Sequence, residues 1–182
     1  MEQEQITMRD NFDLWWRKSE QTDAAIRHNY SKLHTAEMLG ELDEFTTPEQ
    51  TLSRIILLDQ FSRNMFRDSP QAFFADARAR WLAYIVLPEI HTFNPMEQVF
   101  ILLPFEHSES IAEQSISLQG FQRLHAQASE EHKSLFANYL NFAQQHLNII
   151  ARFARFPHRN TILQRPSSHA ELEFLRQPGS SF

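Results

Sequence analysis

Cysteine is absent from this chain, and glycine nearly so. Because none of the 182 residues is cysteine, disulfides, thiolate zinc sites, iron–sulfur clusters and cysteine nucleophiles are excluded. Only 3 glycines are present, well below average usage, which disfavours sheets and tight turns that need positive φ. The two absences together favour a helical fold without thiol chemistry.

The chain also lacks a long apolar run and an excess of positive charge. No apolar stretch approaches the ~20 residues of a membrane span, and Met1-Glu2-Gln3-Glu4-Gln5 has neither the basic nor the apolar part of a signal peptide. The formal net charge is −6, which argues against a protein that mainly binds a phosphate backbone. We therefore expect a cytoplasmic protein with no nucleic-acid and no membrane partner.

Hydrophobic residues are abundant, at 42%, and 16 of them are phenylalanine. This composition excludes disorder for the body of the chain. The length suits one domain with a sizeable core. We place a single all-α domain over residues 1–182, with frayed tails at about 1–7 and 177–182.

Prolines and capping residues divide the chain into helices. Thr47-Pro48-Glu49-Gln50 combines an N-cap Thr, Pro at the first helical position and Gln at the capping-box position. Ser69-Pro70 and Asn94-Pro95 repeat the cap-then-Pro pattern, Ser168-His169-Ala170-Glu171 is another capping box, and Pro104 is expected to bend or break its helix. Short connections predict antiparallel helical hairpins. The predicted helices cover residues 10–18, 22–40, 48–66, 70–87, 95–103, 105–128, 130–155 and 169–176.

Three of these helices carry polar residues in the middle of an apolar face. In 48–66, Asp59 and Arg63 lie near the centre of the stripe, at the i,i+4 spacing of an ion pair. His107 in 105–128 and His146 in 130–155 occupy similar places. Burying such a group unpaired costs about 1–3 kcal/mol, so the three helices point to one shared polar pocket. A purely structural ion pair and satisfied core histidines are the alternative interpretation.

The segment Arg152-Phe153-Ala154-Arg155-Phe156-Pro157-His158-Arg159-Asn160 lies where the helix over 130–155 must stop. Arginine at this density beside aromatic rings suits planar recognition of a carboxylate or a phosphate. It suits a structural ion-pair network equally well. The segment therefore locates a site without specifying an activity.

Several other site classes are excluded or disfavoured. The chain has no Glu-x-x-His or His-x-x-x-His pair and no phosphate-binding glycine loop, so we expect neither a metal nor a cofactor. Glu106, Glu109 and Glu113 fall opposite His107 on the predicted helix and are interpreted as a solvated acidic stripe. Asp76 and Arg80 form another i,i+4 pair, interpreted as structural.

Four segments taken together resemble a known family. They are Leu57-Leu58-Asp59-Gln60-Phe61-Ser62-Arg63-Asn64, Leu103-Pro104-Phe105-Glu106-His107-Ser108-Glu109, Gln114, and Arg155-Phe156-Pro157-His158-Arg159-Asn160. In this order they resemble the mostly bacterial family catalogued as domain of unknown function 924. The resemblance implies a tetratricopeptide-like helical fold and no particular activity. The polar positions that it implies are shared are Asp59, Arg63, Asn64, Asp76, His107, Glu109, Gln114, His146, Arg155, Arg159 and Asn160.

The chain departs from the family pattern in three places. Ala154 and Gln164 stand where the family usually has glycine. The aromatic-rich helix that usually precedes the segment of Trp15 and Trp16 looks shortened, which would favour a dimer or another helix packing. A monomer and a homodimer both remain open.

Two functions follow from these residues. In the first, Arg63, Arg155 and Arg159 hold the oxygens of a small carboxylate or phosphate ligand, Asp59 orients Arg63, and His107 or His146 transfers a proton if a reaction occurs. In the second, the protein is a non-enzymatic interaction module that holds a peptide in a helical groove, and the polar cluster is structural. Whether the protein is an enzyme is left open. The candidate ligand-binding residues are Asp59, Arg63, Asn64, His107, Glu109, Gln114, His146, Arg155, Arg159 and Asn160.

Overall fold

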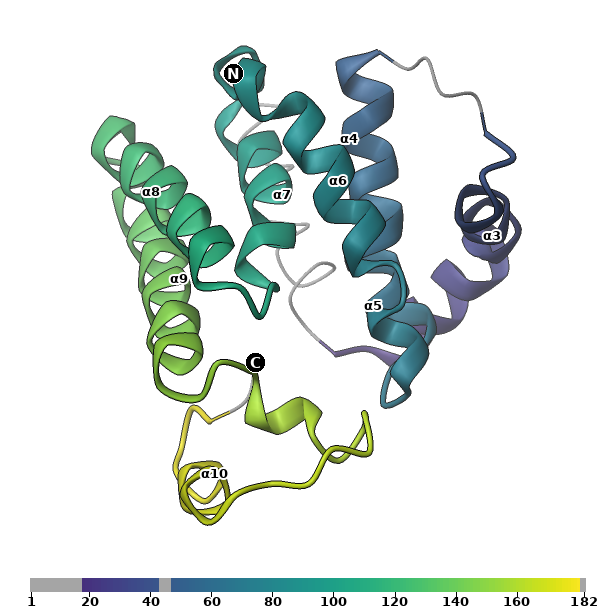
Figure 1. Cartoon of the computed structure of the whole chain (residues 1–182). Coiled ribbons are helices and arrows are strands. Elements are labelled where there is room, and N and C mark those ends of the chain that lie inside the picture. The colour runs from purple at the N-terminus through teal and green to yellow at the C-terminus, as the bar shows by residue number, and fades with distance from the viewer. Residues whose placement is uncertain (1–17, 43–46, 181–182) are drawn as a thin grey trace.

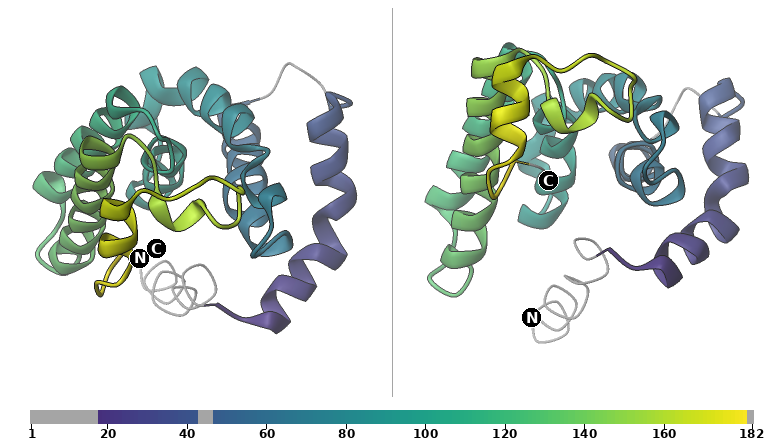
Figure 2. Two further views of the ribbon diagram at one scale, coloured as in Figure 1. Left: turned by 60° about the horizontal axis from the view of Figure 1, so that its bottom comes forward. Right: turned by 90° about the horizontal axis from the view of Figure 1, so that it is seen from below.

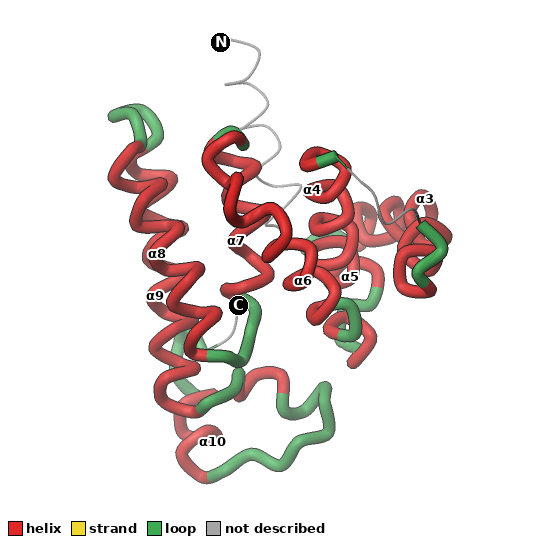
Figure 3. The backbone as a smooth tube through the Cα atoms, turned by 45° about the horizontal axis from the view of Figure 1, so that its top comes forward, coloured by secondary structure: helices red, strands yellow, loops and turns green. Residues whose placement is uncertain are grey.

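A computed structural model of the chain describes residues 18–42 and 47–180. Over those residues the backbone forms helices, turns and loops and no strand (Figure 3), so the all-α class is confirmed. Of the helix predicted over 10–18, only Lys18 is described, and it precedes the first described helix. The α-helices are α3 (Glu20–Leu39), α4 (Pro48–Ile56), α5 (Ser62–Met65), α6 (Asp76–Val86), α7 (Pro95–Glu106), α8 (Ile111–Gln127), α9 (Lys133–Phe153) and α10 (His169–Leu175).

The capping residues begin their helices as predicted. Thr47, Asn94 and Ser168 each accept a hydrogen bond from the backbone of the first turn, and a Gln or Glu three residues later bonds back to the cap. Ser69-Pro70 differs, because it opens the short 3-10 turn Pro70–Phe73 without a side-chain cap. The described part of the expected C-terminal tail, 177–180, is held to α10, since the Ser180 hydroxyl donates to the Leu175 carbonyl at 3.2 Å.

The predicted break within residues 95–128 is misplaced. Helix α7 passes Pro104 and ends at Glu106, and α8 begins only at Ile111. Proline costs its helix one hydrogen bond, but the side chain of Gln114 supplies donors to the Glu106 and Ser108 carbonyls at 2.5 and 2.7 Å. Those bonds satisfy carbonyl groups at and just after the last residue of α7. Residues 107–110 form the connection between α7 and α8.

The helices follow one another across the molecule (Figures 1 and 2). Helix α3 lies at one end, α4, α6 and α7 occupy the middle, and α8 packs beside α9 at the other end. After α9 the chain turns back, and residues 157–168 cross below the helix ends before α10 (Figure 1). We call residues 157–168 the C-terminal crossing segment. The tetratricopeptide-like arrangement that the resemblance implies stays a prediction.

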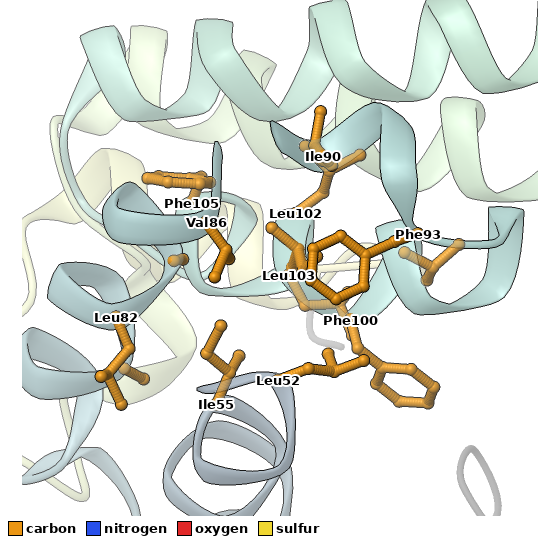
Figure 4. Packing of buried hydrophobic residues seen from close by; sticks show 14 of the residues in the cluster. Leu52, Ile55, Leu82, Val86, Ile90, Phe93, Phe100, Leu102, Leu103 and Phe105 are labelled. Atoms are coloured by element: carbon orange, nitrogen blue, oxygen red, sulfur yellow. The ribbon is translucent and has the colours of Figure 1, made fainter. Parts of the chain in front are cut away.

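The core lies between α4, α6 and α7, and α8 and α9 close it. Figure 4 shows Ile55 of α4, Leu82 of α6 and Leu103 of α7 facing one another, and all three are buried. Helix α8 approaches α7 closely at Gly120, where an added Cβ would lie 2.4 Å from Leu102 Cδ2. Because Gly has no side chain, the two helices can pack at this distance.

Helix α3 attaches to the rest of the protein through polar groups. Its buried residues are Asp23, His34 and Glu37. The Glu37 carboxylate lies 2.7 Å from Arg54 of α4 and 3.2 Å from Arg78 of α6. A helix held by buried ion pairs depends on each partner, because removing one leaves the other charge uncompensated.

Candidate functional site

Asp59 lies at the centre of a buried polar cluster and is carried by a π-helical turn. This turn, Leu57–Phe61, joins α4 to α5, and such turns are frequent at functional sites. The Asp59 side chain is 1% exposed, and its Oδ1 lies 3.1 Å from Arg63 Nη1. The same nitrogen donates to the Asp59 carbonyl oxygen at 2.7 Å, so the i,i+4 pair forms as its spacing predicts.

Arg63 also reaches the start of α6. Its Nη1 and Nη2 donate to the two carboxylate oxygens of Asp76 at 3.0 and 3.3 Å. Arg80, interpreted as the partner of Asp76, lies instead 3.3 Å from Glu113 of α8. Both terminal nitrogens of Arg63 are thus engaged by neighbouring carboxylates.

His107 is the second partner of Asp59. It is the C-cap of α7 and not part of a helix over 105–128, and its Nδ1 lies 2.8 Å from Asp59 Oδ1. Burial alone would raise the pKa of Asp59, but the charge of Arg63 and the interaction with the His107 ring, including its hydrogen bond, hold that pKa well below its ordinary value. The ionised carboxylate can only accept, so Nδ1 carries the proton and a neutral His107 has its lone pair on Nε2.

His146 of α9 lies next to His107, with ring centroids 6.3 Å apart. Its Nδ1 donates to the Phe142 carbonyl at 2.9 Å and lies 3.3 Å from Glu106 Oε1. Burial, with repulsion between the two rings when both are protonated, lowers the pKa of His146 to about 3. Burial, with the charge of Asp59, raises the pKa of Glu106 to about 8. Both groups are therefore uncharged at neutral pH.

The solvated acidic stripe predicted on one helix face is wrong. Glu106 is the last residue of α7 and is buried, Glu109 lies in the connection, and only Glu113 lies in α8. Since the three residues do not share a helix, the spacing argument does not apply to them. Glu109 is bound by Arg165, whose Nη1 and Nη2 donate to its carboxylate at 2.7 and 2.9 Å.

Arg159 enters the cluster from the 3-10 turn that follows α9. Its side chain is 8% exposed, and its guanidinium lies over the rings of Phe73 and Phe156 at 4.8 and 4.4 Å. Asp76 Oδ2 is 3.8 Å from its Nη1, too far for a hydrogen bond. Its buried Nε–H has no acceptor among the described residues. Burial, with the charge of Arg63, lowers the pKa of Arg159 to about 10.

A second hydrogen-bond network holds the C-terminal crossing segment against the connection between α7 and α8. Glu109 Oε1 accepts the Phe156 N–H at 2.8 Å, and Asn160 Oδ1 accepts from Arg165 Nε at 3.0 Å. Although burial raises it, the Arg165 guanidinium holds the pKa of Glu109 below its ordinary value. These contacts fix the turn that presents Arg159.

Arg155 belongs to the outer part of this network. Its Nε and Nη2 donate to the two carboxylate oxygens of Glu171 in α10 at 2.6 and 2.8 Å. The Arg155 hydrogen bonds hold the pKa of Glu171 at about 2. Ala154 and Gln164, which replace the family's usual glycines, have φ of 56° and 53°, a region that glycine adopts more readily.

Asn64 lies apart from the cluster, whereas the buried Gln114 bonds the backbone carbonyl of Glu106 beside it. Asn64 donates to Asp23 of α3 at 2.8 Å, beside the Arg67–Asp23 ion pair. Gln114 caps the end of α7. Of the candidate residues, Asp59, Arg63, His107, His146 and Arg159 therefore gather in one place, Glu109, Arg155 and Asn160 support the C-terminal segment, and their ligand-binding role stays a prediction.

Three members of the cluster were not among the candidate ligand residues. The i,i+4 spacing predicts Arg80 as the partner of Asp76, and the family resemblance implies Asp76 as a shared polar position, but its partner is Arg63. Glu106 was assigned to solvent, because its helix was given the wrong start. His158 was visible in the arginine-rich segment. Burial, with the charge of Arg159, lowers the pKa of His158 to about 4.

Two wider properties concern metal binding and membrane spanning. Within residues 18–42 and 47–180, no group of three or more His, Asp or Glu side chains is arranged to hold a metal ion. Over the same ranges, no helix is long and apolar enough to cross a membrane.

Known proteins similar to this chain agree with the family resemblance. The family described as "Bacterial protein of unknown function (DUF924)" matches residues 3–179. The solved structure of a protein of unknown function, ATU0120 from Agrobacterium tumefaciens, shares 32% sequence identity, covers 92% of this chain and 91% of its own, and superposes with a TM-score of 0.80. No curated protein has a significant match.

Proposed function

This chain belongs to the DUF924 family, and we propose that it binds a small carboxylate or phosphate anion through the guanidinium of Arg159. The proposal rests on the burial of the Arg159 side chain and on its incomplete hydrogen bonding. That side chain is buried between two aromatic rings, its nearest carboxylate is 3.8 Å away, and its Nε–H is unpaired among the residues described. An anion with two oxygens would satisfy the planar fork.

The electrostatics of the cluster favour an added negative charge. Arg63 is balanced by Asp59 and Asp76. Arg159 shares Asp76 at a longer distance, and burial together with Arg63 makes it a weaker base. Burial and the neighbouring positive charges also favour uncharged rings in the surrounding histidines. Asp59 and Asp76 match Arg63 and Arg159 in number, but Asp76 lies close to Arg63 and 3.8 Å from Arg159, so a bound anion would give Arg159 the close partner that it lacks.

The other arginines have different tasks in this proposal. Arg155 is engaged by Glu171 and Arg165 by Glu109, so both shape the segment that carries Arg159. Arg63 positions Asp59 and Asp76 around the site and adds positive charge. Asp59 orients the His107 ring through Nδ1, and the other ring nitrogen, Nε2, would exchange a proton with a ligand.

Arg159→Lys tests the proposal, because it keeps the charge and removes the planar fork. We expect the affinity for phosphate or citrate, measured by titration calorimetry, to fall at least about tenfold, while the urea midpoint stays near wild type. The matched control is Arg155→Lys, which breaks the fork with Glu171. It should lower the urea midpoint, because the fork to Glu171 is lost, and leave any anion affinity of the folded protein unchanged.

The opposite pattern would refute the proposal. If Arg159 only closes an internal ion-pair network, Arg159→Lys should lower stability as Arg155→Lys does. A wild-type protein that shows no heat of binding with phosphate or citrate would also reject it.

A further inference from the structure

We propose that an anion bound beside Arg159 enters together with one proton, which the His107 ring accepts at Nε2 while Asp59 holds its Nδ1. The inference rests on the proposed function and specifies how the site stays electrically balanced. Its basis is the geometry of the Asp59–His107 pair. One nitrogen of the ring is fixed at 2.8 Å from a buried carboxylate, and the other is not needed for that contact.

His107 is better placed to take the proton than the other histidines of the cluster. Its side chain is 15% exposed, and protonation creates a close ion pair with Asp59. His146 is more deeply buried, at 6% exposed, and its Nδ1 donates to a backbone carbonyl. His158 is next to Arg159 in sequence and is held neutral by burial and by that charge.

Charged and titratable groups from several elements act on His107. Asp59 on the π-helical turn favours the protonated ring. Burial, Arg63 on α5 and Arg159 on the C-terminal turn disfavour it. His146 on α9 and His158 on the C-terminal turn are coupled to it, and both are neutral near pH 7. Glu106, on its own helix, is protonated at that pH.

A bound anion favours the protonated His107 ring. Without it, burial and the two guanidinium groups keep the pKa of His107 below its ordinary value. A negative charge beside Arg159 offsets both guanidinium groups and raises that pKa. By linkage, the anion then binds the protonated protein more tightly, and affinity falls as pH rises between the free and the bound pKa.

Sulfate is a suitable probe, because its charge does not change between about pH 5 and about pH 8 and any proton taken up must come to the protein. Its binding to the wild-type protein is measured calorimetrically at each pH in two buffers of different ionisation enthalpy. We expect uptake approaching one proton per sulfate, and affinity falling about tenfold per pH unit where uptake is complete.

His107→Asn identifies the acceptor, because its amide can still donate to Asp59 but cannot titrate. We expect this variant to bind sulfate weakly, with no proton uptake and no pH dependence. His91→Asn, at an exposed histidine before α7, should keep the wild-type uptake and is the control.

The outcomes separate the two proposals. Sulfate binding with no proton uptake by the wild-type protein would overturn this inference and leave the anion site intact. Uptake that persists in His107→Asn would assign the proton to another group and also overturn it. If sulfate, phosphate and citrate all fail to bind, the proposed function fails and this inference with it.

Discussion

Glu106 should make stability fall as pH rises, because it is a buried carboxyl group that stays protonated in the folded protein. The buried neutral His146 and His158 act in the opposite sense below their ordinary pKa, so the Glu106 contribution is isolated by comparing a variant with wild type. Burial raises its pKa from an ordinary 4.5 to about 8, and the nearby Asp59 carboxylate adds to the rise. In the unfolded chain the same group loses its proton near its ordinary pKa. Replacing it by glutamine, which has a similar shape and does not titrate, removes this difference.

The sign and size of the effect follow from proton linkage. Between its two pKa values, Glu106 binds more protons in the folded protein than in the unfolded chain, so its contribution to stability falls as pH rises. Integrating from about pH 5 to about pH 8 gives a loss of about 3–4 kcal/mol from this one group. Relative to wild type, Glu106→Gln should therefore gain about that much stability over the same interval.

Urea denaturation of both proteins across this pH range measures the effect, and Glu171→Gln is the control. The Arg155 hydrogen bonds place the pKa of Glu171 at about 2, so Glu171 is ionised in both states at these pH values. Its loss should lower stability by a similar amount throughout. If the curve of Glu106→Gln also runs parallel to wild type, Glu106 is not protonated in the folded protein and the reasoning is wrong.

Two further substitutions test the backbone and the attachment of α3. Ala154→Gly should raise the free energy of unfolding by about 0.5–1 kcal/mol, because Ala154 has a φ of 56°. Ala151→Gly, exposed inside α9, should instead lower it by about 1 kcal/mol, and equal effects in urea titrations would contradict the conformational argument. Glu37→Gln should cost about 3–5 kcal/mol, because it removes the charge that compensates the buried Arg54 and the adjacent Arg78. A loss below about 1 kcal/mol in the same assay would show that α3 is not held by these ion pairs.

The sequence by itself determined the helical class and most helix starts. Thr47, Asn94 and Ser168 are local signals, because an N-cap acts on backbone groups within its own first turn. The Asp59–Arg63 pair is local too, since residues four apart lie on one face of a helix. The family resemblance, which implies glycine at positions 154 and 164, was also informative, because Ala154 and Gln164 both adopt positive φ.

The helix boundary predicted at Pro104 is wrong, because a proline inside a helix can either end it or be tolerated. Pro104 removes one hydrogen bond, and whether the helix continues depends on what satisfies the carbonyl groups nearby. Gln114, eight residues after the last helical residue Glu106, bonds the end of α7. That contact forms only after α8 folds back against α7. The sequence pattern therefore predicts the end of α7 too early and wrongly predicts that Glu106 is exposed to solvent.

Only the tertiary structure decided what each arginine does. From the sequence, Arg63, Arg155 and Arg159 were equivalent candidates for an anion. The fold brings Asp59 and Asp76 to Arg63 and Glu171 to Arg155, and it leaves Arg159 between aromatic rings with a long ion pair. Helical periodicity specifies which face a side chain occupies, whereas its partners come from segments distant in the chain, and they determine its charge balance.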